Sequence, residues 1–519
     1  VTAKLLEEGR QRSQVMDHLD HLVNEIGPRL TGSKRLTQAQ EWAAARFRAF
    51  GLKNVRLEPW GTLEVGFDRG THRAVMHALG LQKGAEYPLT IQTHAWTPGT
   101  NGPKRGPALL LPADQAEWQA LEAKAKGAWL VLRGGTSKAV EEFAQKAGAH
   151  GVVLKGGDLL LTGGNHRTKW EQWPKVVIVR LLKKDYDDLR GRLDIGGTLD
   201  LEIDVQNHFV KGPIELCNVI AEIPGSEKPD ELVIVGGHID SWDGATGTTD
   251  NGTGVATTLE AARLLMVAGA QPRRTIRFML WSGEEQGLLG SRGYIEKHPE
   301  ENAKISAVLV HDGGTNYVAG IPATEDLLPL FEQAFAELKD LDPEMPFVIR
   351  KVNRLPFPIG SDHDSYLMAG VPGFFWDQKG RANYNHTHHT QHDTFAAAIP
   401  EYQRHSSMVI ALGALGVANL PELLPRTNLP RGVNPAAQRR RLGVQLVEGT
   451  LRIDAVNEDG LARKAGIVKG DEIVAVDGKA VTTFEDLAKE LNGGEPVKKV
   501  KVRRNGQSVV VEIRFPGAK

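Results

Sequence analysis

The fold of the chain is decided by the stretch Val233-Ile234-Val235-Gly236-Gly237-His238-Ile239-Asp240. Its continuous apolar run is typical of a strand that is buried on both faces of a sheet. A helical pattern follows at about 253–267, then an apolar run at 275–281, a helix at about 288–296 and a third apolar run at 305–310. This alternation predicts an α/β fold in which a mainly parallel sheet is flanked by helices.

Residues of the kind that bind metals follow each of these three apolar runs. The first run ends in His238-Ile239-Asp240, the second leads to Glu284-Glu285, and the third ends in His311-Asp312. Asp250 stands just before the helix that follows the first run, and the histidine-rich stretch 386–393 comes much later. Because ligands bind at the carboxyl ends of parallel strands, we expect these residues to meet over one edge of the sheet.

Each of these features alone has an ordinary structural explanation. A histidine at a strand end, such as His238, is usually hydrogen-bonded, and the pair Glu284-Glu285 suits the start of a helix because the helix dipole favours negative charge there. Four converging carboxylates would repel one another, however, unless cations neutralised them. The single cysteine, Cys217, excludes a thiolate cluster and an intramolecular disulfide, so we expect a metal site made of histidine and carboxylate ligands.

Length and composition limit the class of protein further. At roughly 150 residues per domain, a chain of 519 residues should hold roughly three or four domains. Its 63 basic and 64 acidic residues give a net charge of −1, which indicates no nucleic-acid partner. The longest apolar stretch, 408–420, is shorter than the roughly 20 residues that cross a bilayer, so it predicts a buried helix and no membrane span.

Changes of pattern along the chain indicate separate units. An amphipathic helix at about 36–50, closed by Gly51, belongs to the first part. Short strands at 108–154, with a helix among them, indicate a small unit of their own. Prolines repeated within 421–437 predict a stiff linker, and the remaining residues 438–519, with a hairpin expected at Asn505-Gly506, form a last unit.

Six short motifs follow one another in the central part of the chain. They are His238-Ile239-Asp240-Ser241-Trp242-Asp243, Thr249-Asp250-Asn251-Gly252-Thr253-Gly254, Ser282-Gly283-Glu284-Glu285-Gln286-Gly287, His311-Asp312, Ser361-Asp362-His363 and His389-Thr390-Gln391-His392-Asp393-Thr394. In order and spacing they resemble the cocatalytic di-zinc exopeptidases, which include bacterial leucyl aminopeptidases and glutamate carboxypeptidases, in particular the plasma glutamate carboxypeptidase type of dipeptidase. The resemblance covers residues 1–105 and 206–420 and implies a zinc-exopeptidase fold of the phosphorylase/hydrolase-like kind.

The resemblance implies two zinc ions per chain. One would be held by His238 and Asp312, the other by Glu285 and His389, and Asp250 would bridge them. His389 is chosen because the family spacing is His, three residues, then Asp-Thr, which Asp393-Thr394 matches. The alternatives in this stretch are His386, His388 and His392. Three protein ligands per metal and a shared water suit catalytic rather than structural zinc. Asp240, two residues after His238, would orient its imidazole ring.

Catalytic and substrate-binding residues follow from the same resemblance. Glu284 would act as general base, taking a proton from the water that bridges the metals and delivering it to the leaving amine. Many relatives have Tyr just before the last histidine ligand, where this chain has His388, so His388 is the candidate for stabilising the oxyanion. The stretch Ser361-Asp362-His363 is expected to line the substrate pocket, although a plain loop role is an alternative.

Two accessory units are also suggested by resemblance. Residues 106–205 resemble a β-rich protease-associated (PA) domain inserted into the peptidase, through Gly127–Gly134 and Lys146–Gly151. Residues 438–519 resemble a PDZ domain, a small β-barrel. Its Leu442, Gly443 and Val444 would form the loop that binds the carboxylate of a peptide or protein C-terminus.

Together these features predict a secreted or periplasmic di-zinc exopeptidase, an aminopeptidase or dipeptidase that cleaves small peptides. The chain starts at Val1 without a methionine, and no leader is left to read. The alternatives are a carboxypeptidase of the glutamate carboxypeptidase type, a non-catalytic PA/PDZ binding protein, and a single-zinc acyltransferase such as a glutaminyl cyclase. The presence of Glu284 with five candidate ligands argues against the second, and the complete two-metal ligand set argues against the third.

Overall fold

The computed structural model describes residues 1–79 and 84–430 and, towards the C-terminus, 442–446, 450–456, 460–483, 486–487, 490–491, 495, 497–504 and 506–515. The chain divides into two compact units, Val1–Arg431 and Gly432–Lys519. The predicted linker residues 431–437 and the predicted start of the last unit, 438–441, lie outside the described residues. Among the described helices, none has the length and hydropathy needed to span a membrane.

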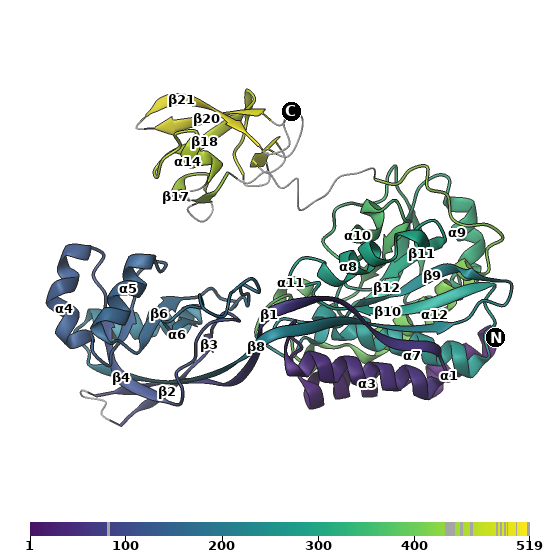
Figure 1. The fold of residues 1–519 in the computed structure, drawn as a ribbon, viewed down its shortest axis with the longest axis horizontal. Helices are drawn as coiled ribbons and strands as arrows, with labels where there is room; N and C mark the ends of the chain where they lie inside the picture. Colours follow the sequence, from purple (N-terminus) through teal and green to yellow (C-terminus); the bar gives the residue numbers. More distant parts are fainter. Residues whose placement is uncertain are drawn as a thin grey trace. The chain divides into compact units, whose positions relative to one another are not determined.

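The centre of the first unit is the predicted parallel sheet. Its parallel strands are β9 (Lys228–His238), β10 (Arg274–Trp281), β11 (Ile305–Val310) and β14 (Gly373–Phe375), in the order β14-β11-β9-β10. The register pairs Trp281 with His238 and Val310 with Gly236, so the strands end at nearly the same level. This alignment brings the loops that follow the strands to one edge of the sheet (Figure 1).

Helices cover both faces of this sheet, because alternate residues of each buried strand point to opposite sides. Val233 and Val235 of β9 belong to one core and Ile234 to another. The first core is built by helices α1 (Thr2–Gln11), α2 (Val15–Asp20), α3 (Lys34–Phe50), α7 (Thr253–Ala268) and α12 (Pro400–Ala418). The second is covered by α8 (Leu289–Lys297) and α10 (His363–Met368) (Figure 1). The fold class predicted from the sequence is therefore confirmed.

Local sequence explains where the predicted helices begin and end. Ser33 caps α3 by accepting a hydrogen bond from the Leu36 amide at 3.1 Å. The helix ends at Gly51, whose φ of 89° is unfavourable for residues that carry a Cβ atom. The helix predicted at 408–420 is α12, which starts eight residues earlier with Pro400 at its first position.

Two long antiparallel strands, which the sequence pattern did not reveal, connect the central sheet to a second set of strands. They are β1 (Lys53–Ala78) and β8 (Leu199–Ile223), whose pairing contains several register shifts. Beyond them lie β4 (Lys104–Leu110), β5 (Trp129–Val131), β6 (Gly151–Lys155), β7 (Ile178–Leu181) and β3 (Ile91–Gln92), with β2 (Glu86–Leu89) beside β1. Helices α4 (Trp118–Ala125), α5 (Lys138–Ala147) and α6 (Lys183–Asp194) pack on these strands (Figure 1).

The small unit expected at 108–154 is thus present as strands and helices, but it shares the sheet of the first unit. The boundaries predicted at 105/106 and 205/206 fall within β4 and β8. Shorter elements complete the unit: β12 (Tyr317–Ala323), β13 (Val348–Lys351), β15 (Asp377–Lys379), α9 (Leu328–Ala334), α11 (Tyr384–Thr387) and the single turns His21–Ile26, Gln115–Glu117, Thr248–Gly252, Pro299–Glu301, Ala336–Leu338 and Phe395–Ala397.

The second unit is a small β structure with its own core. Its elements are β16 (Val444–Leu446), β17 (Ile453–Val456), α14 (Leu461–Lys464), β18 (Glu472–Val476), β19 (Lys479–Ala480), β20 (Val497–Arg504) and β21 (Gln507–Arg514). Leu442, Ile473 and Val500 lie in the buried core. β20 and β21 pair up to Arg504 and Gln507, as expected of the predicted hairpin, although Asn505 lies outside the described residues.

Candidate active site

The loops at the carboxyl ends of the parallel strands carry the predicted metal-type residues. His238 is the last residue of β9, Glu284 and Glu285 follow β10, and Asp312 follows β11. Asp250 lies in the turn before α7, where the Asp250–Asn251 peptide bond is cis. The structure brings all of them together, with two clusters that share Asp250.

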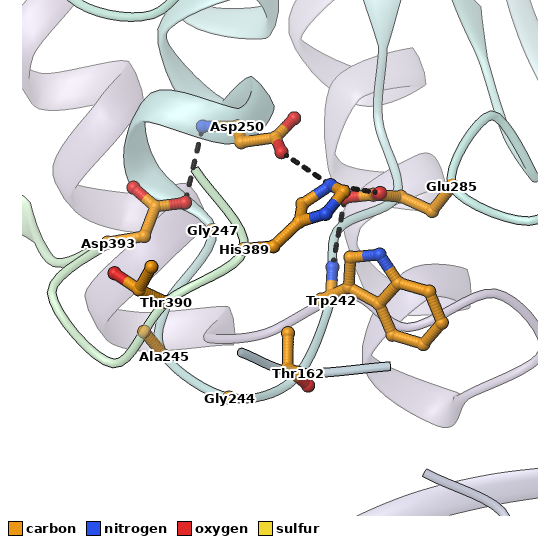
Figure 2. Close-up of a pocket in the computed structure, with 10 residues that line it drawn as sticks. All are labelled: Thr162, Trp242, Gly244, Ala245, Gly247, Asp250, Glu285, His389, Thr390 and Asp393. Atoms are coloured by element: carbon orange, nitrogen blue, oxygen red, sulfur yellow. Dashed lines mark hydrogen bonds and ion pairs between the residues drawn. The ribbon is translucent and has the colours of Figure 1, made fainter. Parts of the chain in front are cut away.

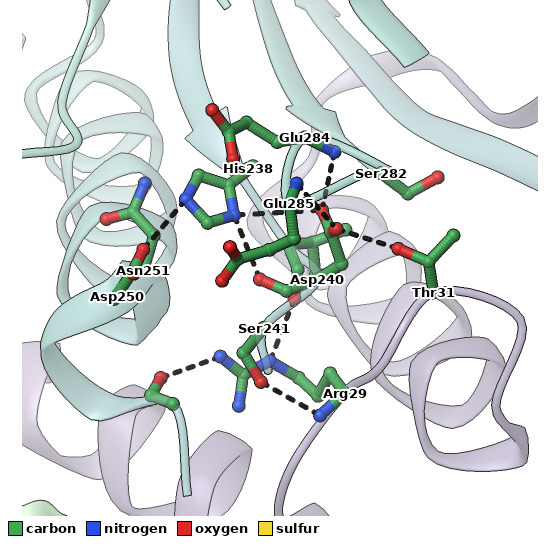
Figure 3. A network of polar contacts seen from close by, with 12 residues as sticks. Arg29, Thr31, His238, Asp240, Ser241, Asp250, Asn251, Ser282, Glu284 and Glu285 are labelled. Atoms are coloured by element: carbon green, nitrogen blue, oxygen red, sulfur yellow. Dashed lines mark hydrogen bonds and ion pairs between the residues drawn. The ribbon is translucent and has the colours of Figure 1, made fainter. Parts of the chain in front are cut away.

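The first cluster contains His238, Asp250 and Asp312, all of them buried. The Nε2 atom of His238 lies 3.0 Å from Asp312 Oδ1 and 3.2 Å from Asp250 Oδ1. Figure 3 shows His238 between Asp250 and the Asp240 backbone. One oxygen of Asp250 therefore faces this cluster.

The second cluster contains Asp250, His388 and His389. The Nε2 atom of His389 lies 3.1 Å from Asp250 Oδ2 and 2.9 Å from Glu285 Oε2 (Figure 2). His388 is more distant, with Nε2 3.7 Å from Asp250 Oδ2. The other oxygen of Asp250 thus faces this cluster, so the carboxylate lies between the two.

These distances fit zinc ions. Ligand atoms that surround a zinc ion tetrahedrally at about 2.0–2.1 Å lie about 3.3 Å from one another. The four closest contacts in the two clusters fall between 2.9 and 3.2 Å. Within the described residues Asp250 Oδ2 has no hydrogen-bond partner, although His389 Nε2 lies within ion-pair distance of it. The hollow beside Asp250, Glu285 and His389 has a volume of about 10 Å³, about the space of one water-sized guest. The donor set and the distances therefore suit a metal ion.

Asp240 supports the site through backbone and side-chain contacts. Its carboxylate accepts a hydrogen bond from Thr31 Oγ1 at 2.8 Å and from the amides of Glu284 and Glu285 at 3.3 Å each. The atom closest to His238 Nδ1 is the Asp240 carbonyl oxygen, at 2.9 Å, whereas the nearest carboxylate oxygen lies at 3.6 Å. Asp240 therefore adjoins the imidazole as predicted, but mainly through its backbone.

Arg29 is a supporting residue that the sequence reasoning did not single out. Its guanidinium is fully buried and donates to the carbonyls of Ile239, Thr246 and Gly247 at 2.8–3.0 Å (Figure 3). Burial lowers the pKa of Arg29 to about 10. Its charge sits behind the site and offsets part of the negative charge there. The sequence signal that could have indicated Arg29 is the early motif Gly27-Pro28-Arg29, which precedes α3.

Asp393 holds the turn that carries Asp250. Its two carboxylate oxygens accept hydrogen bonds from the backbone amides of Thr249 and Asp250, at 2.5 and 3.2 Å. Asp393 itself is buried, and burial together with the charge of Asp250 raises its pKa to about 7. In the sequence, Asp393 served only to mark the spacing that selects His389. In the structure it also holds the backbone of the turn that carries Asp250, the shared carboxylate.

The crowding of acids changes their proton affinities. Burial and the charge of Asp250 raise the pKa of Glu285 to about 7. Burial also raises the pKa of Glu284 well above its usual range, helped by Asp312 and Glu285 and opposed by His238. Burial would raise the pKa of Asp250 too, but His238 and His389 hold it far below its usual range. The shared carboxylate is therefore ionised, while Glu284 can carry a proton.

His388 and the stretch 361–363, which were also predicted from the sequence, have surroundings that differ from those of the metal-type residues. The rings of His388 and His389 stack at 3.9 Å, and the His388 side chain is 45% exposed. Ser361, Asp362 and His363 are all buried, and among the residues that the structure describes their side-chain polar atoms have no hydrogen-bond partner, although His363 Nε2 lies 3.4 Å from Asp364 Oδ1. These three do not line the hollow of Figure 2. The sequence alone could not show where these three side chains lie, because it does not reveal that helix α10 begins at His363.

The segment between β6 and β7 reaches the site from the distant strands. The Thr162 amide donates to the His389 carbonyl at 2.9 Å, and the Leu160 amide donates to Gln391 Oε1 at 2.8 Å. Thr162 and Trp242 line the hollow beside His389 (Figure 2). The backbone of His389, whose φ is 59°, is thus held by a part of the chain more than 200 residues away.

Comparisons with known proteins show which proteins this chain is similar to. Residues 218–413 match the model of Peptidase family M28, and residues 452–504 match that of the PDZ domain. The chain is 29% identical to Carboxypeptidase Q of Rattus norvegicus over 432 residues, which cover 81% of this chain and 88% of that protein. Carboxypeptidase Q of Homo sapiens is 28% identical over 434 residues, with the same two coverages. A crystal structure of a Peptidase M28 precursor from Shewanella amazonensis is similar with a TM-score of 0.59 and 24% identity, covering 83% of this chain and 98% of that one.

Proposed function

We propose that this chain, whose residues 218–413 match the model of Peptidase family M28, is a two-zinc aminopeptidase or dipeptidase that hydrolyses small peptides. The observation that carries the proposal is the pair of clusters that share Asp250, one oxygen facing His238 and the other facing His389. A carboxylate placed in this way can bridge two cations. Such a pair of metals can polarise a carbonyl group and activate a water, which is the chemistry that hydrolysis of a peptide bond needs.

We assign five residues to the two metals. His238 and Asp312 would hold one zinc ion, Glu285 and His389 the other, and Asp250 both. When bound, the two ions polarise the scissile carbonyl and lower the pKa of the attacking water. His388, which belongs to the second cluster by geometry, is the alternative to Glu285 as a ligand there.

Glu284 is assigned as the general base. Glu284 directly precedes Glu285, and burial raises its pKa, which increases its affinity for a proton. It would take one proton from the attacking water and deliver it to the nitrogen of the leaving amine. Asp240 would keep the backbone amides of Glu284 and Glu285 in place meanwhile.

A carboxypeptidase is the second candidate. Carboxypeptidase Q is the name of the curated relatives that match along most of their length, and this favours a substrate with a free C-terminus. We also propose that the strands and helices of 106–205 form a PA-like insert that limits access to the site, since Thr162 lines the hollow at His389. The secreted or periplasmic location remains a prediction.

The PDZ domain offers a second binding site. We propose that Leu442, Gly443 and Val444 bind the C-terminus of a peptide or protein. Gly443 has a φ of 77°, and within the described residues β16 pairs only with β17, so its other edge could accept an added strand.

The decisive experiment uses aminoacyl-nitroanilides, dipeptides and N-blocked peptides, each with and without a chelator. Cleavage that requires a free amine and stops with chelator supports the aminopeptidase or dipeptidase, whereas equal cleavage of N-blocked peptides favours the carboxypeptidase. Glu284→Gln should keep both zinc ions and lose about 10²–10⁴-fold in kcat. Substantial remaining turnover would remove Glu284 from the role of base.

A further inference from the structure

We propose that Thr162 and Trp242 form a wall beside the second cluster, so that a bound peptide must end there and only the bond next to that free terminus is cleaved. The inference rests on the proposed peptidase function and adds the two residues that limit its substrates. A site can reject a longer peptide by placing side chains where the extra residues would lie. The room beside the second cluster therefore decides which peptides fit.

The hollow beside the second cluster is almost filled. Its volume is about 10 Å³, which is about the space of one water-sized guest. It is lined by the metal-type residues Asp250, Glu285 and His389 and by the two wall residues, and Figure 2 shows Thr162 below these metal-type side chains. A further residue of a peptide does not fit into this space.

Trp242 is held in place by its ring and by its backbone. The centroid of its ring lies 6.2 Å from that of His389, at an interplanar angle of 74°, and 6.5 Å from that of the buried Trp96, at 84°. Both arrangements are edge-to-face contacts, which aromatic rings favour. The Trp242 amide also donates to Glu285 Oε1 at 3.2 Å. The indole therefore cannot turn aside for a longer peptide without losing these ring contacts.

Thr162 belongs to the segment between β6 and β7, which is tied to the loop of His389. The Thr162 amide donates to the His389 carbonyl at 2.9 Å, and the Leu160 amide donates to Gln391 Oε1 at 2.8 Å. Both donors are backbone groups. The position of residue 162 therefore does not depend on its own side chain, which can be shortened without releasing the segment.

The wall also has polar atoms that lack a partner. Among the described residues, Thr162 Oγ1 and Nε2 of the buried Gln92 have no hydrogen-bond partner. A Cβ atom at Gly244 would lie 2.9 Å from Thr162 Cβ and closer still to Gln92 Nε2, so both side chains pack on the loop that follows Trp242. Buried polar groups usually bind a partner or an ordered water. The small hollow therefore suits the polar end group of a peptide better than an apolar side chain.

Room for the rest of a peptide is found at another part of the loop 384–393. A hollow of about 410 Å³ is lined by Thr315 and Thr387, among others. Thr387 Oγ1 accepts a hydrogen bond from Thr249 Oγ1 at 2.8 Å, so this hollow adjoins the turn that carries Asp250. A hollow of a few hundred Å³ is large enough for part of a small peptide. A peptide that ends at the wall can therefore extend into this hollow.

The test measures how strongly a blocked terminus slows cleavage, in the full chain loaded with zinc. The probes are trialanine, N-acetyl-trialanine and trialanine amide, and the wild type should reject the probe whose blocked end would meet the wall. An extra group that a pocket must accommodate changes kcat/KM by about 10–200-fold. Trp242→Ala and Thr162→Ala should each raise the ratio of kcat/KM for the rejected probe to that for trialanine by at least about tenfold. Zinc content should not change.

The matched control is Thr136→Ala. Thr136 lies between β5 and α5, it does not line the hollow, and its hydroxyl is likewise buried without a partner among the described residues. This variant should keep the wild-type ratio.

Four results would overturn the inference. They are a wild type that cleaves both blocked probes as fast as trialanine, a ratio that neither Trp242→Ala nor Thr162→Ala raises, a loss of zinc in these two variants, and an equal rise of the ratio in Thr136→Ala. Absence of any hydrolysis of the three probes by the zinc-loaded wild type would instead overturn the proposed function.

Discussion

Replacing Asp393 with asparagine should weaken zinc binding without touching a proposed ligand. Asp393 is buried, and its two oxygens accept the amides of Thr249 and Asp250 at 2.5 and 3.2 Å. An asparagine has only one carbonyl oxygen, so its NH₂ group would face the second backbone amide. One hydrogen bond to a charged acceptor is lost, and one buried N–H is left without an acceptor. Together these changes cost about 2–4 kcal/mol of folding free energy.

The same change should reach the metals through Asp250. Because the Asp250 amide is no longer held, the carboxylate shared by both clusters loses its fixed orientation, and supporting contacts of this kind are worth about 10–100-fold in metal affinity. The assay is a competition titration with a zinc chelator at pH 8, above the pKa of about 7 that Asp393 has in the fold. At this pH the wild-type carboxylate is ionised.

Asp377→Asn is the control for this experiment. Asp377 pairs with Arg350 at 2.6 Å on the surface, where such a pair contributes roughly 0–1 kcal/mol. This variant should bind zinc like the wild type. If Asp393→Asn also binds zinc within threefold of the wild type, the backbone contacts of Asp393 do not position Asp250, and the reasoning is refuted.

Three further predictions concern the ligands, the metal-free state and the insert. His389→Ala should lower the zinc content measured by metal analysis, and if His388→Ala does so instead, the spacing argument is wrong by one residue. Burial raises the pKa of Glu285 to about 7, so this carboxyl stabilises the metal-free fold less as pH rises from 4.5 to 7; the melting temperature of the wild type relative to that of Glu285→Gln should therefore fall through this window, and a difference that does not change with pH would contradict the assignment. Gln391→Ala removes the acceptor of the Leu160 amide and should speed proteolytic cleavage within 156–165, which an unchanged digestion rate would rule out.

The meeting of the candidate ligands at one edge of the sheet could be predicted from the sequence because it depends on local order. Three apolar runs end in His238, Glu284-Glu285 and Asp312, and parallel strands in register necessarily place their carboxyl ends together. The helices predicted between them are present because their periodicity and caps are local as well. The family resemblance of the six motifs is confirmed by the match to Peptidase family M28.

The pairing of strands that are far apart in the chain could not be predicted from the sequence. Strands β1 and β8 pair across more than 100 residues, and their register shifts interrupt the alternation that would mark a strand. The contact between Thr162 and His389 likewise joins segments whose proximity depends on that ladder.

The sequence by itself therefore determined the sheet, the ends of its strands and the residue types that meet there, because these follow from hydrophobic periodicity and chain order. The tertiary structure alone decided how Asp250 is shared between His238 and His389, and which atom of Asp240 faces the imidazole. The physical reason is that distances of about 3 Å between side chains depend on backbone turns and on contacts between segments far apart in the chain, which no local pattern of residues encodes.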